Sequence, residues 1–89
     1  MAIAIQVYGT DWCRLTFVVR EYLTRSRVDY DYFNIDQDPN AHDFVVAMHD
    51  GRRRFPLVVF EERVLTDPTL ADLQKLLDVA RAHPGRRRS

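Results

Sequence analysis

Apolar residues follow two different periods along the chain, and the change of period predicts the order of strands and helices. Residues 3–8 form a short apolar run rich in β-branched side chains and bounded by Gly9, which is typical of a strand buried on both faces. From Cys13 onward the apolar positions return every three or four residues, the spacing of an amphipathic helix. These positions are Leu15, Val18, Val19, Tyr22 and Leu23. Thr10 and Asp11 precede this helix and are its expected N-cap residues.

A second strand and a second helix are predicted next. Residues 28–35 alternate apolar and polar side chains over most of their length, which indicates a strand. Asp36, Asp38 and Pro39 then offer a cap and a first-turn proline for a helix. We expect this helix to end near Gly51, as its C′ residue. Its apolar positions at helical spacing are Ala41, Phe44, Val45 and Met48.

A hairpin and a third helix complete the pattern. A proline opens the apolar run 57–60, a place where a strand tolerates proline. The run 63–65 follows so closely that only a hairpin can join the two strands. Thr66 or Asp67, followed by Pro68, is expected to start the last helix. Its inner face is predicted to consist of Leu70, Leu73, Leu76, Leu77 and Ala80.

The expected order is therefore strand, helix, strand, helix, strand, strand, helix (βαβαββα). Right-handed crossovers make the first two strands parallel, and the hairpin adds two antiparallel strands. This predicts an α/β fold with a four-stranded mixed sheet and helices on both faces. Because 89 residues suit a single domain, we expect one domain over residues 1–85 and a disordered basic tail at residues 86–89.

Composition and charge exclude several classes of protein. The chain is 46% hydrophobic and 29% charged, as in ordinary globular proteins. Lys plus Arg and Asp plus Glu both number 13, so no global field favours nucleic acid. No apolar run approaches the roughly 18 residues that cross a bilayer, and the N-terminus lacks the pattern of a secretory signal. We therefore expect a protein that does not act at a membrane. A single cysteine precludes an internal disulfide, so we also expect the protein to be cytoplasmic.

Cys13 is the residue with the clearest chemical potential. It lies where the loop after the first strand enters the first helix, and the N–H groups and dipole of a helix N-terminus favour a thiolate. The thiolate is the nucleophile of disulfide exchange. Trp12 beside it offers either a shield for the sulfur or a surface for a partner. The alternative for a lone cysteine is an inert, small apolar role.

The chain resembles the glutaredoxin family of the thioredoxin fold, in particular its short mycoredoxin-like members, over nearly its whole length. The resemblance rests on segments 7–13, 55–60 and 64–68, which hold a Trp-Cys pair, a strand opened by proline and the approach to the last helix. It implies a glutaredoxin-like fold and thiol–disulfide oxidoreductase activity. Cys13 matches the family's nucleophilic cysteine, and Pro56 matches the cis-proline that faces it.

The same resemblance implies a binding groove beside the proline. The backbone of Phe55 is expected to pair with a bound thiol peptide as an added strand. Thr66 and Asp67 match the place where glutathione-binding members hold the ligand's α-amino end, although Asp67 could instead cap the helix before Pro68. Residues 52–54, all arginine, could contact carboxylates of a thiol or of an acidic partner, or form a solvated turn.

Several positions depart from the family's pattern. Thr16 stands in place of the second cysteine, and its Oγ1 can bond the Cys13 sulfur but cannot resolve a mixed disulfide. The resemblance then implies a monothiol cycle that an external thiol, glutathione or mycothiol, completes. Arg14 favours the thiolate, whereas Asp11, in place of a basic residue, opposes it. The bulk of Phe55 could narrow the groove.

Three functions remain open at this point. The first is a monomeric glutaredoxin-like oxidoreductase that acts through Cys13 on a disulfide-bearing protein with a small thiol and no tightly bound cofactor. The second is a redox-inactive binding module that uses the groove beside Pro56. The third is a dimer that shares a [2Fe–2S] cluster through two Cys13 thiolates. The expected binding residues are Trp12, Arg14, Phe55, Pro56, Thr66 and Asp67. No metal is expected at His42, His49 or His83, which lack the spacing of a metal site.

Overall fold

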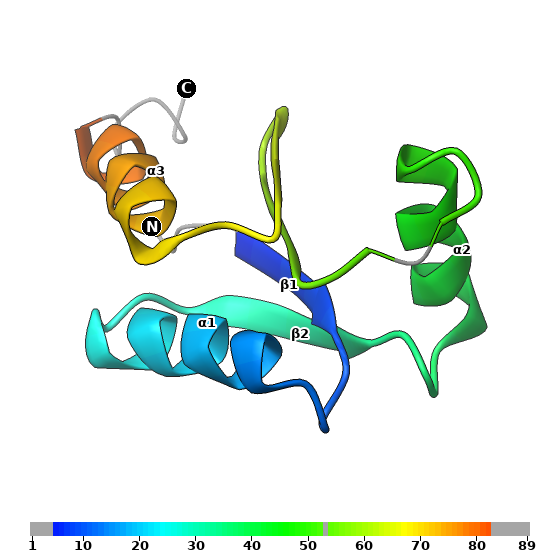
Figure 1. The fold of residues 1–89 in the computed structure, drawn as a ribbon. Helices are drawn as coiled ribbons and strands as arrows, with labels where there is room; N and C mark the ends of the chain where they lie inside the picture. Colours follow the sequence, from blue (N-terminus) through cyan, green and yellow to red (C-terminus); the bar gives the residue numbers. More distant parts are fainter. Residues whose placement is uncertain (1–4, 53, 83–89) are drawn as a thin grey trace.

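The computed structural model describes residues 5–52 and 54–82, and the seven expected elements follow in the expected order (Figure 1). The strands are β1 (Ile5–Gly9), β2 (Tyr30–Asn34), β3 (Leu57–Phe60) and β4 (Arg63–Thr66). The helices are α1 (Arg14–Arg25), α2 (Pro39–Met48) and α3 (Leu70–Ala82). The end of the predicted domain at residue 85, the predicted tail and His83 lie outside the described residues.

The four strands form one mixed sheet in the order β2-β1-β3-β4. β1 pairs in parallel with β2, placing Val7 opposite Tyr32, and antiparallel with β3, placing Val7 opposite Val58. β3 and β4 form the antiparallel hairpin. The two continuous apolar runs are thus the two central strands, where both faces of the sheet are covered.

Helices cover both faces of this sheet, as Figure 1 shows, with α1 and α3 on one side and α2 on the other. Each face has its own core. The larger core joins α1 and α3 to the central strands through Ile5, Val7, Val19, Leu23, Val28, Val58, Phe60, Leu73, Leu76, Leu77 and Ala80. The smaller core lies under α2 and consists of Tyr8, Ile35, Ala41, Val45 and Leu57. The predicted α/β fold is confirmed.

Four apolar residues predicted to face the core are instead exposed, among them Phe44, which is 36% exposed. Leu15 is 51% exposed, because the buried face of α1 begins at the next residue, Thr16, and continues at helical spacing from there. Leu70 is 50% exposed, because it begins α3 one turn before the first buried leucine. Met48 ends α2 and is 45% exposed. The periodicity identified the helices correctly but extended their inner faces too far.

Two of the predicted helix starts are wrong. The N-cap of α1 is Cys13, not Thr10 or Asp11. The residue before α3 is Thr69, not Thr66 or Asp67. Its backbone N–H donates to the Asp72 carboxylate at 3.0 Å, and the Asp72 N–H donates to its Oγ1 at 3.1 Å. This reciprocal pair is a capping box.

The ends of α2 follow the sequence more closely. Asp38 is the N-cap, as expected, and its Oδ1 accepts from the N–H groups of Asn40 and Ala41. The C-cap of the helix is His49, so Asp50 occupies the C′ position. Gly51, which the sequence predicted at C′, comes one position later. Its φ of +87° still lies in the region that glycine favours. Within residues 5–52 and 54–82, no helix combines the length and apolar character of a membrane span.

Candidate functional site

Cys13 ends the loop between β1 and α1 and is the N-cap residue of α1. Its φ and ψ are −84° and 123°, an extended conformation, and its carbonyl accepts from the Phe17 N–H at 3.1 Å. Its side chain makes no capping hydrogen bond and is partly exposed. The N–H groups of the first helical turn have no partners within the helix and point toward this end of α1, where they favour a negative charge.

Trp12 connects the cysteine loop to the loop that precedes β3. Its side chain is 70% exposed, yet its Nε1–H donates to Asp36 Oδ2 at 2.8 Å. Its ring meets the Phe55 ring edge to face, with centroids 5.6 Å apart. The Phe55–Pro56 peptide bond is cis. The fold therefore brings the Trp-Cys pair and the proline segment together, although 43 positions separate Trp12 from Phe55.

Thr66 and Asp67 lie at the same end of the sheet as Pro56. The Asp67 N–H donates to the Pro56 carbonyl at 2.8 Å, and Asp67 adopts a φ of 49°. The alternative role of Asp67 as a helix cap is therefore wrong, since Thr69 holds that position. Thr66 Oγ1 lies 2.8 Å from His49 Nε2. Sequence reasoning missed His49, and its only signal was a histidine at the C-terminal end of a predicted helix.

Thr16 is buried beneath Cys13 in the first turn of α1. Its side chain is 1% exposed, and among the described residues its Oγ1 has no hydrogen-bond partner. The expected bond to the Cys13 sulfur is thus not formed here. Instead Thr16 packs against Gly9, where a Cβ would collide with Thr16 Oγ1. Gly9 is required at this position because α1 crosses β1 so closely.

The Asp11 carboxylate is hydrogen-bonded to a residue of β2. The Tyr32 hydroxyl donates to Asp11 Oδ1 at 2.9 Å, and the Arg20 guanidinium lies 3.8 Å from the centre of the Tyr32 ring. Burial, together with the hydrogen bond to Asp11, raises the pKa of the Tyr32 hydroxyl well above its usual value. Arg14, the other charged neighbour of Cys13, is exposed.

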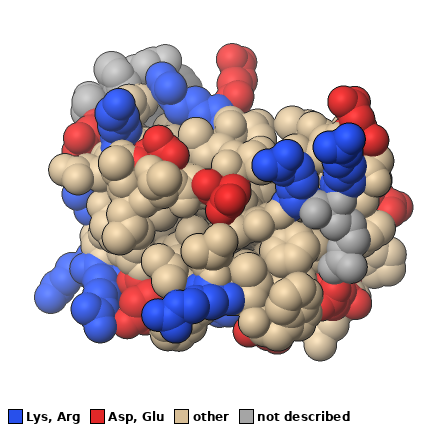
Figure 2. Space-filling view, viewed as in Figure 1, with Lys and Arg blue, Asp and Glu red and all other residues tan. Residues whose placement is uncertain are grey.

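Exposed apolar side chains precede and follow Cys13 along the chain. Trp12, Leu15 and Phe17 are all more than half exposed, and Phe17 follows Cys13 by one helical turn. Large apolar side chains are usually buried, so these exposed residues offer contact area to a visiting molecule. By contrast, the face drawn in Figure 2 shows acidic and basic side chains interspersed, in keeping with a net charge of zero.

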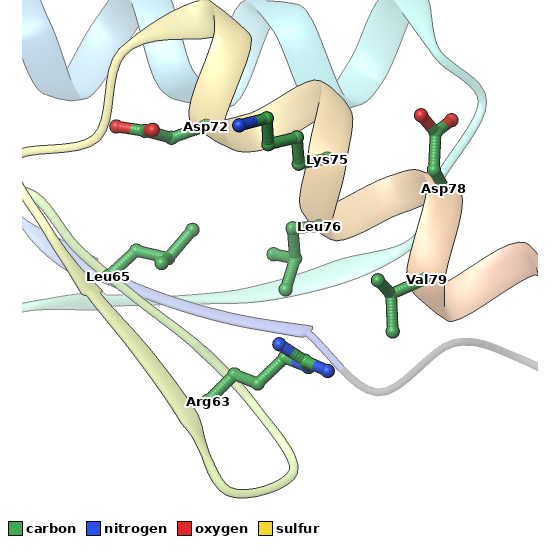
Figure 3. Close-up of a pocket in the computed structure, with 7 residues that line it drawn as sticks. All are labelled: Arg63, Leu65, Asp72, Lys75, Leu76, Asp78 and Val79. Carbon is green, nitrogen blue, oxygen red and sulfur yellow. The ribbon is translucent and has the colours of Figure 1, made fainter.

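A separate cavity of about 490 Å³ lies between β4 and α3. Figure 3 shows apolar side chains at its floor and charged side chains at its rim. Its lining residues are Arg63, Leu65, Asp72, Lys75, Leu76, Asp78 and Val79. It holds no cysteine. In the part of the chain that the structure describes, no group of three or more His, Cys, Asp or Glu side chains could bind a metal ion.

The comparison with known proteins agrees with this geometry. The sequence profile of the Glutaredoxin family matches residues 5–65. The chain therefore belongs to the glutaredoxin family, as the sequence resemblance indicated. It is 32% identical over 79 residues to the Mycobacterium tuberculosis protein Rv3198A, assigned as a glutaredoxin, covering 86% of this chain and 94% of that one. It is also 30% identical to mycoredoxin 1 of Corynebacterium glutamicum, covering 78% and 86% of the two chains.

Solved structures show the same fold. The crystal structure of the thioredoxin-like protein BC3987 superposes with a TM-score of 0.72 at 28% identity, covering 81% of this chain and 97% of that chain. The Archaeoglobus fulgidus glutaredoxin superposes with a TM-score of 0.71 at 22% identity, covering 84% and 86%. The thioredoxin-like architecture predicted from the sequence is confirmed.

Proposed function

We propose that this protein is a monothiol thiol–disulfide oxidoreductase that uses Cys13 and an external small thiol. Membership of the glutaredoxin family supports thiol–disulfide chemistry in general. The observation that carries the finer proposal is the place of Cys13, a partly exposed N-cap next to the Trp12–Phe55 contact and the cis-proline segment. Because it is the only cysteine of the chain, no second thiol of the same chain can complete the cycle.

The cycle has two exchange steps. The Cys13 thiolate attacks the small-thiol sulfur of a mixed disulfide between a protein and that thiol. A new disulfide forms between Cys13 and the small thiol, the old disulfide breaks, and the protein thiolate leaves and takes a proton. A second small-thiol thiolate then attacks the sulfur of the bound small thiol. This step yields the oxidised small-thiol dimer and regenerates the Cys13 thiolate.

Different residues are proposed to bind the two halves of the mixed disulfide, the protein and the small thiol. The exposed side chains of Trp12, Leu15 and Phe17 offer apolar area to the protein half. Thr66 and Asp67, next to Pro56, are proposed to hold the small thiol. Two small thiols are candidates for the co-substrate. Glutathione is suggested by the glutaredoxin family, and mycothiol by the relative named mycoredoxin 1. We place the reaction in the cytoplasm, where such thiols keep cysteines reduced.

The test is turnover of a protein–glutathione and a protein–mycothiol mixed disulfide by the wild type and by Cys13→Ser. The variant is expected to fall to the uncatalysed rate, because serine cannot form the mixed disulfide. Thr24→Ala, an exposed change on the same helix, serves as the control and should keep full activity. Unchanged turnover in Cys13→Ser would overturn the proposal. A wild type that turns over neither substrate would also overturn it, and would favour the redox-inactive binding module.

A further inference from the structure

His49 joins the end of α2 to the end of β4 by two hydrogen bonds. Its Nδ1 lies 2.8 Å from the Val45 carbonyl oxygen, and its Nε2 lies 2.8 Å from Thr66 Oγ1. Both contacts are partly buried, and Thr66 is 17 positions further along the chain. The ring also lines a cavity of about 420 Å³ with Met48, Asp50, Arg52 and Arg54. His49 thus links that cavity to the residues beside Pro56.

The two partners determine which ring nitrogen carries hydrogen. A carbonyl oxygen can only accept, so Nδ1 must donate to Val45. In a neutral imidazole Nε2 is then an acceptor, and the hydroxyl of Thr66 must donate to it. With its hydrogen used in this way, Thr66 Oγ1 has only lone pairs left to offer to another molecule.

We propose that His49 sets the hydrogen-bonding polarity of Thr66 and thereby selects the group that the small thiol presents there. This inference rests on the proposed function, in which Thr66 and Asp67 hold the small thiol. The Thr66 oxygen and the exposed Asp67 carboxylate then both accept hydrogen bonds. Such a pair binds a hydrogen-bond donor, such as an ammonium or hydroxyl group, and disfavours a carboxylate. His49 is a positioning residue, since it acts through Thr66.

Protonation of His49 reverses this polarity. An imidazolium donates from both nitrogens, so Thr66 Oγ1 becomes the acceptor and its hydrogen turns outward as a donor. The charged groups near the ring are Asp50 at the end of α2, Arg52 and Arg54 in the following segment, and Asp67 after β4. A protonated His49 would therefore weaken the preference for a donor.

The test uses His49→Asn, in which the asparagine amide can still donate to Val45 but does not reach Thr66. The probes are S-methylglutathione, which carries an α-ammonium group, and its N-acetyl derivative, which does not. Calorimetry at pH 8 on the full chain is expected to show about a tenfold preference of the wild type for the ammonium probe. His49→Asn and Thr66→Val should each lose most of this preference. The double variant should lose no more than either single variant, because both changes remove one interaction.

The control is His42→Asn, which changes a histidine of α2 whose Nδ1 lies 3.4 Å from Asp43 Oδ1. It should keep the wild-type preference. A preference that survives in His49→Asn, losses that add in the double variant, or a wild type with no preference would each overturn the inference. If His49→Asn does not fold, Thr66→Val alone decides by the same criterion.

The two proposals can fail separately because binding needs no turnover. A wild type that shows the His49-dependent preference but no turnover contradicts the proposed function alone. A wild type that turns over through Cys13 but shows no such preference contradicts only the role of His49.

Discussion

At the scale of single residues, Cys13 lies between two side chains of opposite charge along the chain. Arg14 follows it with an exposed guanidinium, and Asp11 precedes it by two positions. The hydrogen bond from Tyr32 holds the Asp11 carboxylate toward β2 and takes up part of its charge. The sequence shows both charges but not this bond, because Tyr32 lies 21 positions away and reaches Asp11 only through strand pairing.

Asp11→Asn is expected to speed alkylation of Cys13 by iodoacetamide at neutral pH. Removing a negative charge favours the thiolate, and asparagine still offers an oxygen to Tyr32, so the local geometry is retained. For the removal of a nearby surface charge, we expect an increase of about twofold to fivefold. Stopped-flow alkylation rates provide the measurement. Asp29→Asn, an exposed change before β2, is the control, and an Asp11→Asn rate no faster than this control would contradict the prediction.

At the scale of elements, the helices follow from their periodicity, whereas their starting residues depend on tertiary contacts. Thr10, Asp11, Thr66 and Asp67 are all suitable cap residues, and each was a reasonable local choice. The Thr10 side chain is instead buried, the Asp11 carboxylate bonds Tyr32, and the Thr66 hydroxyl bonds His49. A side chain that is buried or bonded in this way is no longer available to cap a helix.

The capping box of α3 gives a test at this scale. Thr69→Ala is expected to reduce the free energy of unfolding by about 1 kcal/mol, the usual cost of losing an N-cap oxygen. Urea unfolding at pH 7 measures it, with Asp78→Asn on the exposed face of α3 as the control. A loss in Thr69→Ala no larger than in the control would show that the box contributes nothing.

The same box predicts a pH dependence. Hydrogen bonds from the Thr69 amide and hydroxyl hold the pKa of the Asp72 carboxyl below its usual value. The stabilisation from this carboxylate is therefore present above the usual carboxyl range near pH 4 and is lost as the pH falls through the lowered pKa. Asp72→Asn should destabilise the protein at pH 7 and approach the wild type at about pH 3. A stability difference that stays constant between these pH values would contradict the assignment.

At the scale of the whole molecule, one sheet joins two separate cores. β1 and β3 contribute side chains to both the larger core under α1 and α3 and the smaller core under α2. Because the two central strands are shared, a defect in either core weakens the same sheet. We expect the described part of the chain to unfold in one transition, as small single domains usually do.

Two leucines of α3 test which side of this helix faces the larger core. Leu77→Ala is expected to cost about 2–5 kcal/mol, because Leu77 is 2% exposed and its removal leaves a cavity in the larger core. Leu70→Ala on the same helix should cost less than about 1 kcal/mol, since that side chain is half exposed. Guanidinium unfolding followed by circular dichroism measures both. Equal costs would mean that Leu70 faces the core after all.

The sequence by itself determined the order of the elements, the mixed sheet and the place of Cys13 at a helix N-terminus. Strand and helix periods arise from backbone geometry, and the strand-to-helix junction is a local pattern, so neighbours along the chain suffice for both. The family resemblance followed from three short segments for the same reason.

Only the tertiary structure decided what lies around the cysteine. The Trp12–Phe55 contact, the Tyr32–Asp11 bond and the His49–Thr66 bond each join segments far apart in the chain. Such contacts depend on how the helices pack against the sheet and on which side chains that packing leaves within reach, and no local pattern encodes those distances. The position of the nucleophile is therefore a property of the sequence, whereas its environment is a property of the fold.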